Sequence, residues 1–119
     1  MTTVLVLEDD PDLLNLYTRA LKFRGYDVHF TDSAENAISL LDQHTLTPDV
    51  AVLDMSMPGL PGSAVVQHIR GDVQYRHMPI IVISCNEDFR KELRESNVTF
   101  MTKPINIRDL YNAVAEFVM

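Results

Sequence analysis

The chain has 119 residues, 46% of them hydrophobic and 23% charged, which is typical of one soluble globular domain spanning residues 1–119. Its formal net charge of −7 disfavours direct binding to nucleic acid phosphates or to an anionic membrane. The single cysteine, Cys85, excludes an internal disulfide, and the sequence has neither a signal peptide nor an apolar stretch of the ~20 residues that a membrane span needs, so we expect a cytoplasmic protein.

Apolar runs alternate with helical patterns from the beginning of the chain. Residues 3–7 form a β-branched run that predicts a buried strand. Asp10 and Pro11 then predict the start of a helix, and Gly25 its end. Residues 27–31 alternate like a more exposed strand, and Ser33 can cap a second helix.

The middle of the chain repeats this order. Residues 50–53 predict a third buried strand, and residues 55–62 contain two prolines and two glycines, which indicates a loop. A helix is expected over residues 63–70, with its apolar side chains facing inward. Residues 80–84 then form a nearly continuous β-branched run, which predicts a fourth strand.

The last part adds a short, highly charged helix over residues 88–95, a fifth strand over 98–102, and a helix capped by Asn106. The order is therefore strand and helix five times over. Strands that are apolar on both sides and joined by helices imply a parallel sheet covered on both faces, which is an α/β fold.

Charged residues follow three of the predicted strands. Glu8 and Asp9 come after the first strand, Asp54 ends the third, and Lys103 follows the fifth. Because the carboxyl ends of parallel strands share one edge, we expect these side chains to converge there. Crowded carboxylates need a cation, and Mg²⁺ prefers oxygen ligands. Asp9 and Asp54 are the predicted direct ligands, Glu8 acts through water, and a backbone carbonyl near Ser56 supplies another oxygen.

The same edge has the groups that a phosphoryl group requires. A metal, the ammonium of Lys103 and the hydroxyl of Ser84, which ends the fourth strand, would neutralise or bind its oxygens. A carboxylate can itself be the nucleophile and form an aspartyl phosphate. Asp54 stands between the expected metal and Lys103, so it is the candidate acceptor. Lys103 is expected to pair with Asp54 when the site is empty.

Four motifs in this order resemble the receiver domain of two-component response regulators over essentially the whole chain. They are V-L-V-L-E-D-D-P at 4–11, V-L-D-M-S-M-P-G at 52–59, I-V-I-S at 81–84 and F-M-T-K-P at 100–104. Each motif alone is weak, but all four at successive strand ends are specific. The resemblance implies a flavodoxin-like (βα)5 three-layer sandwich with strand order 2-1-3-4-5.

The resemblance also implies a role for each site residue. Asp54 would receive a phosphoryl group from a histidine kinase, with Glu8 and Asp9 holding Mg²⁺, for which Mn²⁺ could substitute. Ser84 and Lys103 would contact the phosphoryl group, and Phe100 would turn inward as Ser84 moves. The bond between Lys103 and Pro104 is expected to be cis.

The implied partners are a histidine kinase or phosphotransfer protein and a downstream output domain or protein, with a phosphorylation-dependent dimer left open. No direct contact with nucleic acid or membrane is expected. The domain would not be an enzyme beyond Mg²⁺-dependent self-phosphorylation and slow self-dephosphorylation. The chain ends after the last helix, so we expect either a stand-alone receiver or the first part of a longer regulator.

Some features depart from the family pattern. Cys85 follows Ser84 where a small residue is usual, and we interpret it as filling a small core space. The segment from Ser84 to Phe100 is short, so the fourth helix should be short or irregular, with Asn97 able to adopt a left-handed cap. The histidines have no metal-ligand spacing and are interpreted as solvated surface residues: His29, His44, His68 and His77.

Three other functions fit the sequence less well. A phosphorylation-independent pseudo-receiver, acting only as an interaction module, is disfavoured because every acceptor residue is present. A magnesium-dependent phosphohydrolase usually has a second acid two residues after the nucleophile, where this chain has Ser56. A flavodoxin must hold a phosphate in its first loop, which Glu8, Asp9 and Asp10 would repel.

Overall fold

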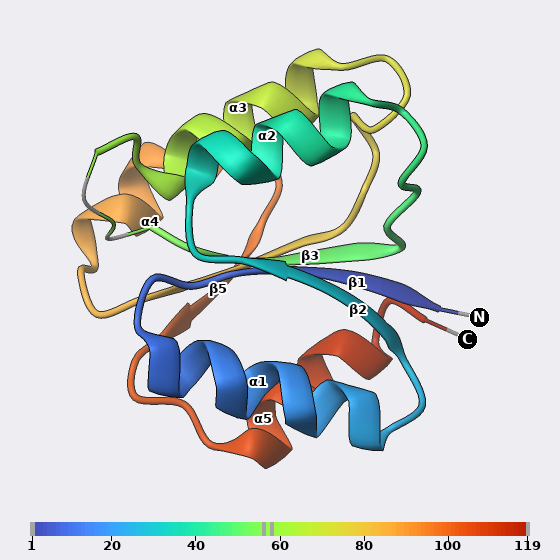
Figure 1. The fold of residues 1–119 in the computed structure, drawn as a ribbon. Helices are drawn as coiled ribbons and strands as arrows, with labels where there is room; N and C mark the ends of the chain where they lie inside the picture. The colour runs from blue at the N-terminus through green and yellow to red at the C-terminus, as the bar shows by residue number, and fades with distance from the viewer. Residues whose placement is uncertain (1, 56, 58, 119) are drawn as a thin grey trace.

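The fold is a five-stranded parallel sheet between two layers of helices (Figure 1). The computed structural model describes residues 2–55, 57 and 59–118. The strands lie in the order β2-β1-β3-β4-β5, which confirms the predicted flavodoxin-like α/β topology. Their bounds are β1 (Thr3–Leu7), β2 (Asp27–Thr31), β3 (Val50–Asp54), β4 (Ile80–Ser84) and β5 (Thr99–Thr102).

The helices divide between the two faces of the sheet. In Figure 1, α1 and α5 cover one face, and α2 and α3 cover the other, with α4 at the end where β4 finishes. Their bounds are α1 (Pro11–Phe23), α2 (Ala34–Asp42), α3 (Gly62–Gly71), α4 (Asp88–Glu92) and α5 (Ile107–Ala115). This arrangement is the three-layer sandwich that the alternating pattern predicted.

Two apolar cores lie on opposite sides of the sheet because successive strand side chains point to opposite faces. In β1, Leu5 and Leu7 pack with α2 and α3, whereas Val4 and Val6 pack with α1 and α5. The central strands β1, β3 and β4 are buried almost throughout. The sheet is therefore a rigid platform, and the groups at its carboxyl edge are held by well-packed strands.

The predicted helix starts are confirmed by side-chain caps. Asp10 accepts hydrogen bonds from the backbone of Asp12 and Leu13, Ser33 from Asn36, and Asn106 from Asp109. Each bond satisfies a backbone N–H that has no partner within the helix. Gly25 has the positive φ of 87° expected of a residue that ends a helix.

The fourth helical segment is short, as expected, and its predicted extent of 88–95 is wrong. α4 ends at Glu92, and a separate 3₁₀ turn, η1, spans Arg94–Ser96. Asn97 follows with φ 55° and ψ 60°, which confirms the predicted left-handed conformation. β5 consequently begins at Thr99 and not at residue 98. This charged stretch has few apolar side chains to bury. Leu93 is buried in the core, and the tighter 3₁₀ turn follows it directly.

Arg70 of α3 fastens this irregular segment to the rest of the domain. Its guanidinium donates to the carbonyl oxygens of Ser96 at 2.7 Å and Asn97 at 3.0 Å, and also to those of Met78 and Arg76. Burial lowers the pKa of Arg70, but arginine stays protonated at physiological pH. The side chain of Arg70 therefore donates to backbone carbonyl groups in the segments that precede and follow β4 in the sequence.

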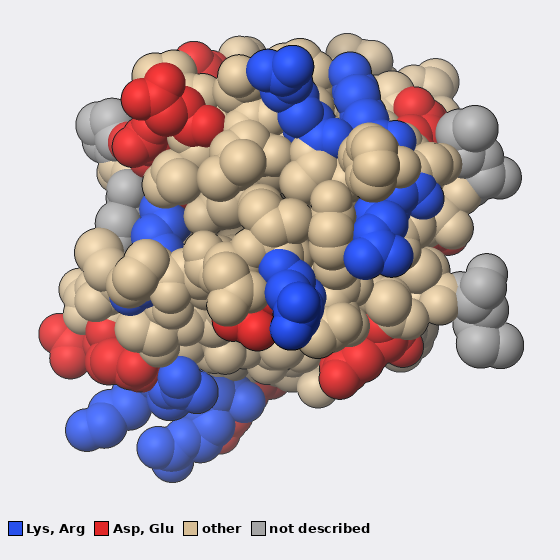
Figure 2. Space-filling model, turned by 90° about the horizontal axis from the view of Figure 1, so that it is seen from below, with Lys and Arg blue, Asp and Glu red and all other residues tan. Residues whose placement is uncertain are grey.

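The α1–α5 face is chemically mixed. Figure 2 shows basic and acidic side chains distributed around a central area of uncharged residues. Leu16 and Phe23 of α1 remain 47% and 85% exposed, so apolar surface is accessible here. Within the described residues, none of the helices has the length and apolar character required to cross a membrane.

Candidate functional site

Three carboxylates meet at the carboxyl edge of the sheet. β1 and β3 are adjacent and in register at Leu7 and Leu53, so Glu8 and Asp54 follow side by side. Glu8 and Asp54 are only 1% and 2% exposed, and Asp9 is half-buried. Oxygen atoms of all three lie within 4.8 Å of one another. Asp10 is excluded from this cluster because its side chain is exposed and caps α1.

Lys103 is the cation that reaches into this cluster, from the residue after β5. Its Nζ atom lies 2.8 Å from Glu8 Oε1 and 3.6 Å from Asp54 Oδ2. The sequence predicted a pair with Asp54, but the closer contact is with Glu8. The backbone N–H of Lys103 donates to the carbonyl oxygen of Ser84 at 2.9 Å, and the bond to Pro104 is cis, as expected.

The charge balance of the site favours an added cation. Three carboxylates and one ammonium leave a net charge of −2 when all are ionised. The donor set consists of carboxylate oxygens held on a rigid sheet edge, which is what Mg²⁺ requires. Glu8, Asp9 and Asp54 therefore fit a magnesium ion. The predicted carbonyl ligand at Ser56 lies outside the described residues.

The electrostatic surroundings keep Lys103 charged. Burial alone lowers the pKa of Lys103, but the hydrogen bond to Glu8 and the charges of Asp54 and Glu8 outweigh it, so the net shift is upward. Because the pKa of Lys103 is higher in the folded than in the unfolded protein, its protonation stabilises the folded state. This stabilisation is complete at pH values below the unfolded-state pKa of about 10.4, and it is lost as the pH rises through the folded-state pKa. At neutral pH the contribution is therefore complete.

We expect Lys103→Met to lower the free energy of unfolding by about 3 kcal/mol at neutral pH, because it leaves two buried carboxylates without their cation. The loss should shrink in acid, where protonated carboxylates need no counter-charge, and when Mg²⁺ is added. Urea unfolding at several pH values measures both effects. Lys91→Met, at an exposed position of α4, is the matched control and should change little. Equal stability of Lys103→Met and the unchanged protein at neutral pH would contradict the expectation.

Ser84 and Phe100 occupy neighbouring strands beside the cluster. Ser84 ends β4, is fully buried, and its Oγ accepts from the backbone N–H of Asn86 at 3.0 Å. Phe100 in β5 is half-buried and pairs in register with Val82 of β4. In the register of β3 and β4, Asp54 pairs with Ile83, so Ser84 lies one residue further along β4 at the same carboxyl edge of the sheet.

The ring of Phe100 is linked to α4. The guanidinium of Arg90 lies 4.5 Å from the centre of the ring, a cation–π arrangement. Arg90 is held by Glu87 at 2.8 Å, and Glu87 also accepts from the hydroxyl of Thr102 at 2.6 Å. Through these contacts, the position of Phe100 and the start of α4 depend on each other.

Cys85 is exposed, so its interpretation as a core residue is wrong. It lines a surface pocket together with Leu13, Tyr17, Lys103, Pro104 and Ile105. Cys85 is the first residue after β4, where the chain leaves the covered sheet. Burial raises the pKa of the Tyr17 hydroxyl above its ordinary value of about 10.

Sequence reasoning treated Gly62 only as a loop glycine, but it begins α3 directly against the site. A Cβ atom built on Gly62 would overlap the backbone carbonyl oxygen of Asp54 and lie 2.9 Å from the Met55 methyl carbon. Only glycine permits α3 to approach the end of β3 this closely. The pattern of prolines and glycines indicated a loop but gave no sign of this contact.

Known proteins of more than one kind are similar to this chain. A family described as the response regulator receiver domain matches residues 4–115. The sensor histidine kinase TmoS of Ectopseudomonas mendocina is 28% identical over 97% of this chain, and the transcriptional regulatory protein TrcR of Mycobacterium tuberculosis is 29% identical over 90%. This chain spans 12% of the length of the first relative and 41% of the second.

Solved structures show the same fold. Chemotaxis protein CheY4 of Vibrio cholerae has a TM-score of 0.89 and 22% identity, with 99% of each chain covered. The receiver domain of the sensor histidine kinase PA1611 of Pseudomonas aeruginosa PAO1 has a TM-score of 0.85 and 21% identity, covering 98% of this chain and 96% of that one. The latter structure has a magnesium ion coordinated in its active-site cleft.

Proposed function

This chain belongs to the response regulator receiver domain family of two-component signalling, and on that premise we propose that Asp54 is its phosphoacceptor. The observation that supports this most strongly is the buried cluster of Glu8, Asp9 and Asp54 with Lys103 3.6 Å from Asp54 Oδ2. It combines a nucleophile, a place for a cation and a fixed positive charge. In this proposal residues 1–119 act as a single receiver domain.

The transfer requires positioning more than covalent chemistry. A carboxylate oxygen of Asp54 attacks the phosphorus of a phosphohistidine, the new oxygen–phosphorus bond forms as the nitrogen–phosphorus bond breaks, and the imidazole leaves with the electron pair. Glu8 and Asp9 would hold Mg²⁺ together with Asp54, and the bound ion would supply charge neutralisation of the phosphoryl oxygens. Lys103 and the hydroxyl of Ser84 contact the remaining oxygens.

The signal then leaves through β5 and α4. Drawing the Ser84 hydroxyl toward the phosphoryl group opens space beside β4 into which Phe100 turns. Inward rotation of Phe100 removes the ring on which Arg90 rests. The short α4 segment, held by Glu87 and Thr102, is then the element whose surface changes.

The phosphodonor in this proposal is a histidine kinase or a phosphotransfer protein, and the recipient of the signal is an output domain or protein. The kinase and transcriptional regulator among the relatives support these partner classes. The exposed thiol of Cys85 is compatible with a cytoplasmic location. The domain performs self-phosphorylation and slow self-dephosphorylation and turns over no separate substrate.

We expect acetyl phosphate to label the protein only when Mg²⁺ or Mn²⁺ is present, because the carboxylate cluster alone repels the donor. Chelation with EDTA should prevent labelling. Hydroxylamine should remove the label, because it cleaves acyl phosphates and leaves phosphoserine intact. Intact-mass spectrometry with and without each reagent measures all three. Failure to take up a phosphoryl group under these conditions would favour the pseudo-receiver alternative.

A further inference from the structure

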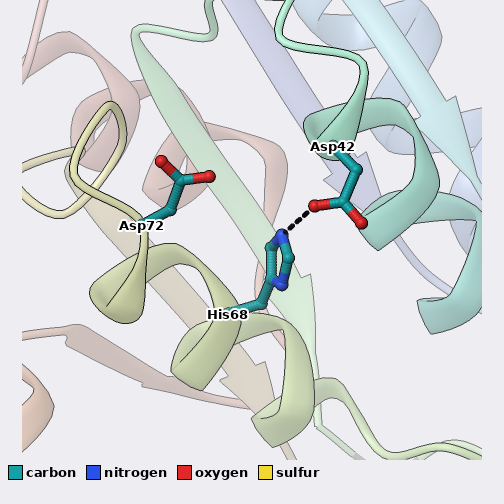
Figure 3. Close-up of side chains that lie close together, drawn as sticks. All are labelled: Asp42, His68 and Asp72. Carbon is teal, nitrogen blue, oxygen red and sulfur yellow. Dashed lines mark ion pairs between the residues drawn. The ribbon is translucent and has the colours of Figure 1, made fainter.

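A second cluster of metal-ligand side chains lies at the other end of the molecule. Figure 3 shows His68 between Asp42 and Asp72, with the imidazole pointing at the carboxylate of Asp42. His68 Nε2 is 2.9 Å from Asp42 Oδ1, and a ligand atom from each of the three residues lies within 4.8 Å of the others. His68 lies at the surface as expected, with a side chain that is 25% exposed, but its Nε2 atom is buried.

Two helices hold this cluster in place. His68 and Asp72 are four residues apart on α3 and at its end, so they lie on one side of the helix, and Asp42 is the last residue of α2. The neighbouring residues Val66 and Ile69 of α3, together with Leu41 of α2, are fully buried. The backbone positions of all three ligands are therefore fixed by the core.

Asp72 is held by a further histidine. Nε2 of His44 lies 3.0 Å from Asp72 Oδ2, and its ring stacks on Tyr75 with centroids 5.7 Å apart. The other carboxylate oxygen of Asp72 accepts from the backbone N–H of Gln74. The carboxylate is only 16% exposed. Hydrogen bonds of this kind orient a metal-binding carboxylate.

The close approach of His68 Nε2 to the Asp42 carboxylate can be bridged by a proton or by a metal ion. Among the described residues this atom is buried and has no partner with hydrogen-bond geometry, although Asp42 is at 2.9 Å. A ring nitrogen this close to a carboxylate oxygen is attracted only when a proton or a metal ion lies between them. Two acidic side chains around one imidazole can supply the charge for a divalent metal.

We propose that Asp42, His68 and Asp72 bind one Zn²⁺-class transition-metal ion, with His44 positioning Asp72. Metal–ligand distances of about 2.1 Å in a tetrahedral site place ligand atoms roughly 3.4 Å apart. The observed separations, from 2.9 Å to at most 4.8 Å, bracket that value, so small side-chain rotations suffice. An imidazole ligand favours zinc, cobalt or nickel over magnesium. The ion would tie the end of α2 to the end of α3.

The site is independent of the proposed phosphoacceptor. Asp42 and Asp72 end helices at the amino edge of the sheet, whereas Asp54 ends β3 at the carboxyl edge. The test therefore uses protein saturated with Mg²⁺ and, in parallel, the Asp54→Asn variant. Mg²⁺ competes with the added ion at the Asp54 cluster, and Asp54→Asn removes one of the three carboxylates of that cluster.

Co²⁺ titration followed by visible absorption is the first measurement, and Zn²⁺ calorimetry the second. We expect one ion per chain with the intense bands of a four-coordinate site, in the unchanged protein and in Asp54→Asn. His68→Gln and Asp72→Asn should each abolish the bands, and His44→Gln should weaken affinity about 10- to 100-fold. His29→Gln is the matched control and should bind the ion normally, because among the described residues His29 pairs with a single carboxylate, that of Asp27 at 3.2 Å.

Thermal unfolding gives a second readout that does not depend on colour. Zn²⁺ should raise the midpoint of the unchanged protein and of His29→Gln, and should leave that of His68→Gln unchanged. Far-UV circular dichroism of the metal-free variants verifies that each is folded. Three results would overturn the site: absence of four-coordinate cobalt bands, bands that survive His68→Gln, or bands lost in Asp54→Asn.

Discussion

Asp54→Asn is expected to reduce labelling by acetyl phosphate at least ~100-fold in the presence of Mg²⁺, because an amide oxygen is a poor nucleophile and forms no stable phosphoryl adduct. The change is nearly isosteric at a side chain that is 2% exposed, so packing around β3 is preserved. Intact-mass spectrometry over a time course measures the effect.

Asp10→Asn is the matched control for Asp54→Asn. Asp10 belongs to the same acidic stretch, but its side chain caps α1 and is exposed, and asparagine caps helices equally well. Labelling of this variant should equal that of the unchanged protein. Full labelling of Asp54→Asn would instead require another acceptor and would refute the assignment.

Gly62→Ala is expected to lower the free energy of unfolding by about 3 kcal/mol or more, because the added methyl group meets backbone that cannot yield cheaply. It would overlap the carbonyl oxygen of Asp54 and lie 2.9 Å from the carbonyl carbon. To relieve this, α3 must move away from the end of β3. Urea unfolding measures the loss, and labelling by acetyl phosphate should fall as Asp54 is displaced.

Gly71→Ala provides the control within the same helix. A Cβ atom at Gly71 meets nothing within 4 Å, and alanine favours helix, so stability should stay constant or increase by about 0.5 kcal/mol. Comparing Gly62→Ala with Gly71→Ala separates the general effect of replacing a helical glycine from the effect of the contact with Asp54. Similar unfolding midpoints for the two variants would show that the contact is unimportant.

The observed contacts around α4 explain why its boundaries were hard to predict. The charged stretch has one fully buried apolar residue, Leu93, and so little periodicity from which to locate a helix end. The path of this segment depends on Arg70, which lies 26 and 27 residues before Ser96 and Asn97. The Arg70 guanidinium donates hydrogen bonds to the carbonyl oxygens of those two residues. Contacts between such distant residues leave no local pattern.

Cys85 and His68 are two further residues whose surroundings the local sequence did not reveal. Cys85 is small and follows a buried strand, which favoured a core position, but its side chain lies beyond the end of β4 and is exposed. His68 lacked a histidine or cysteine at metal-ligand spacing, yet Asp72 lies four residues on and Asp42 comes from the preceding helix, α2. The four-residue spacing from histidine to aspartate was the one local sign available.

The sequence by itself determined the α/β class, the five strands, most helix caps and the residues at one sheet edge. Each of these depends on neighbours in the chain: apolar periodicity sets burial, Asp10 and Asn106 cap their own helices, and parallel strands bring their ends to one side. The tertiary structure alone decided that Lys103 lies closer to Glu8 than to Asp54, that Gly62 touches the end of β3, and that His68 meets Asp42. Those distances are set by how helices and strands far apart in the chain pack, which no local pattern encodes.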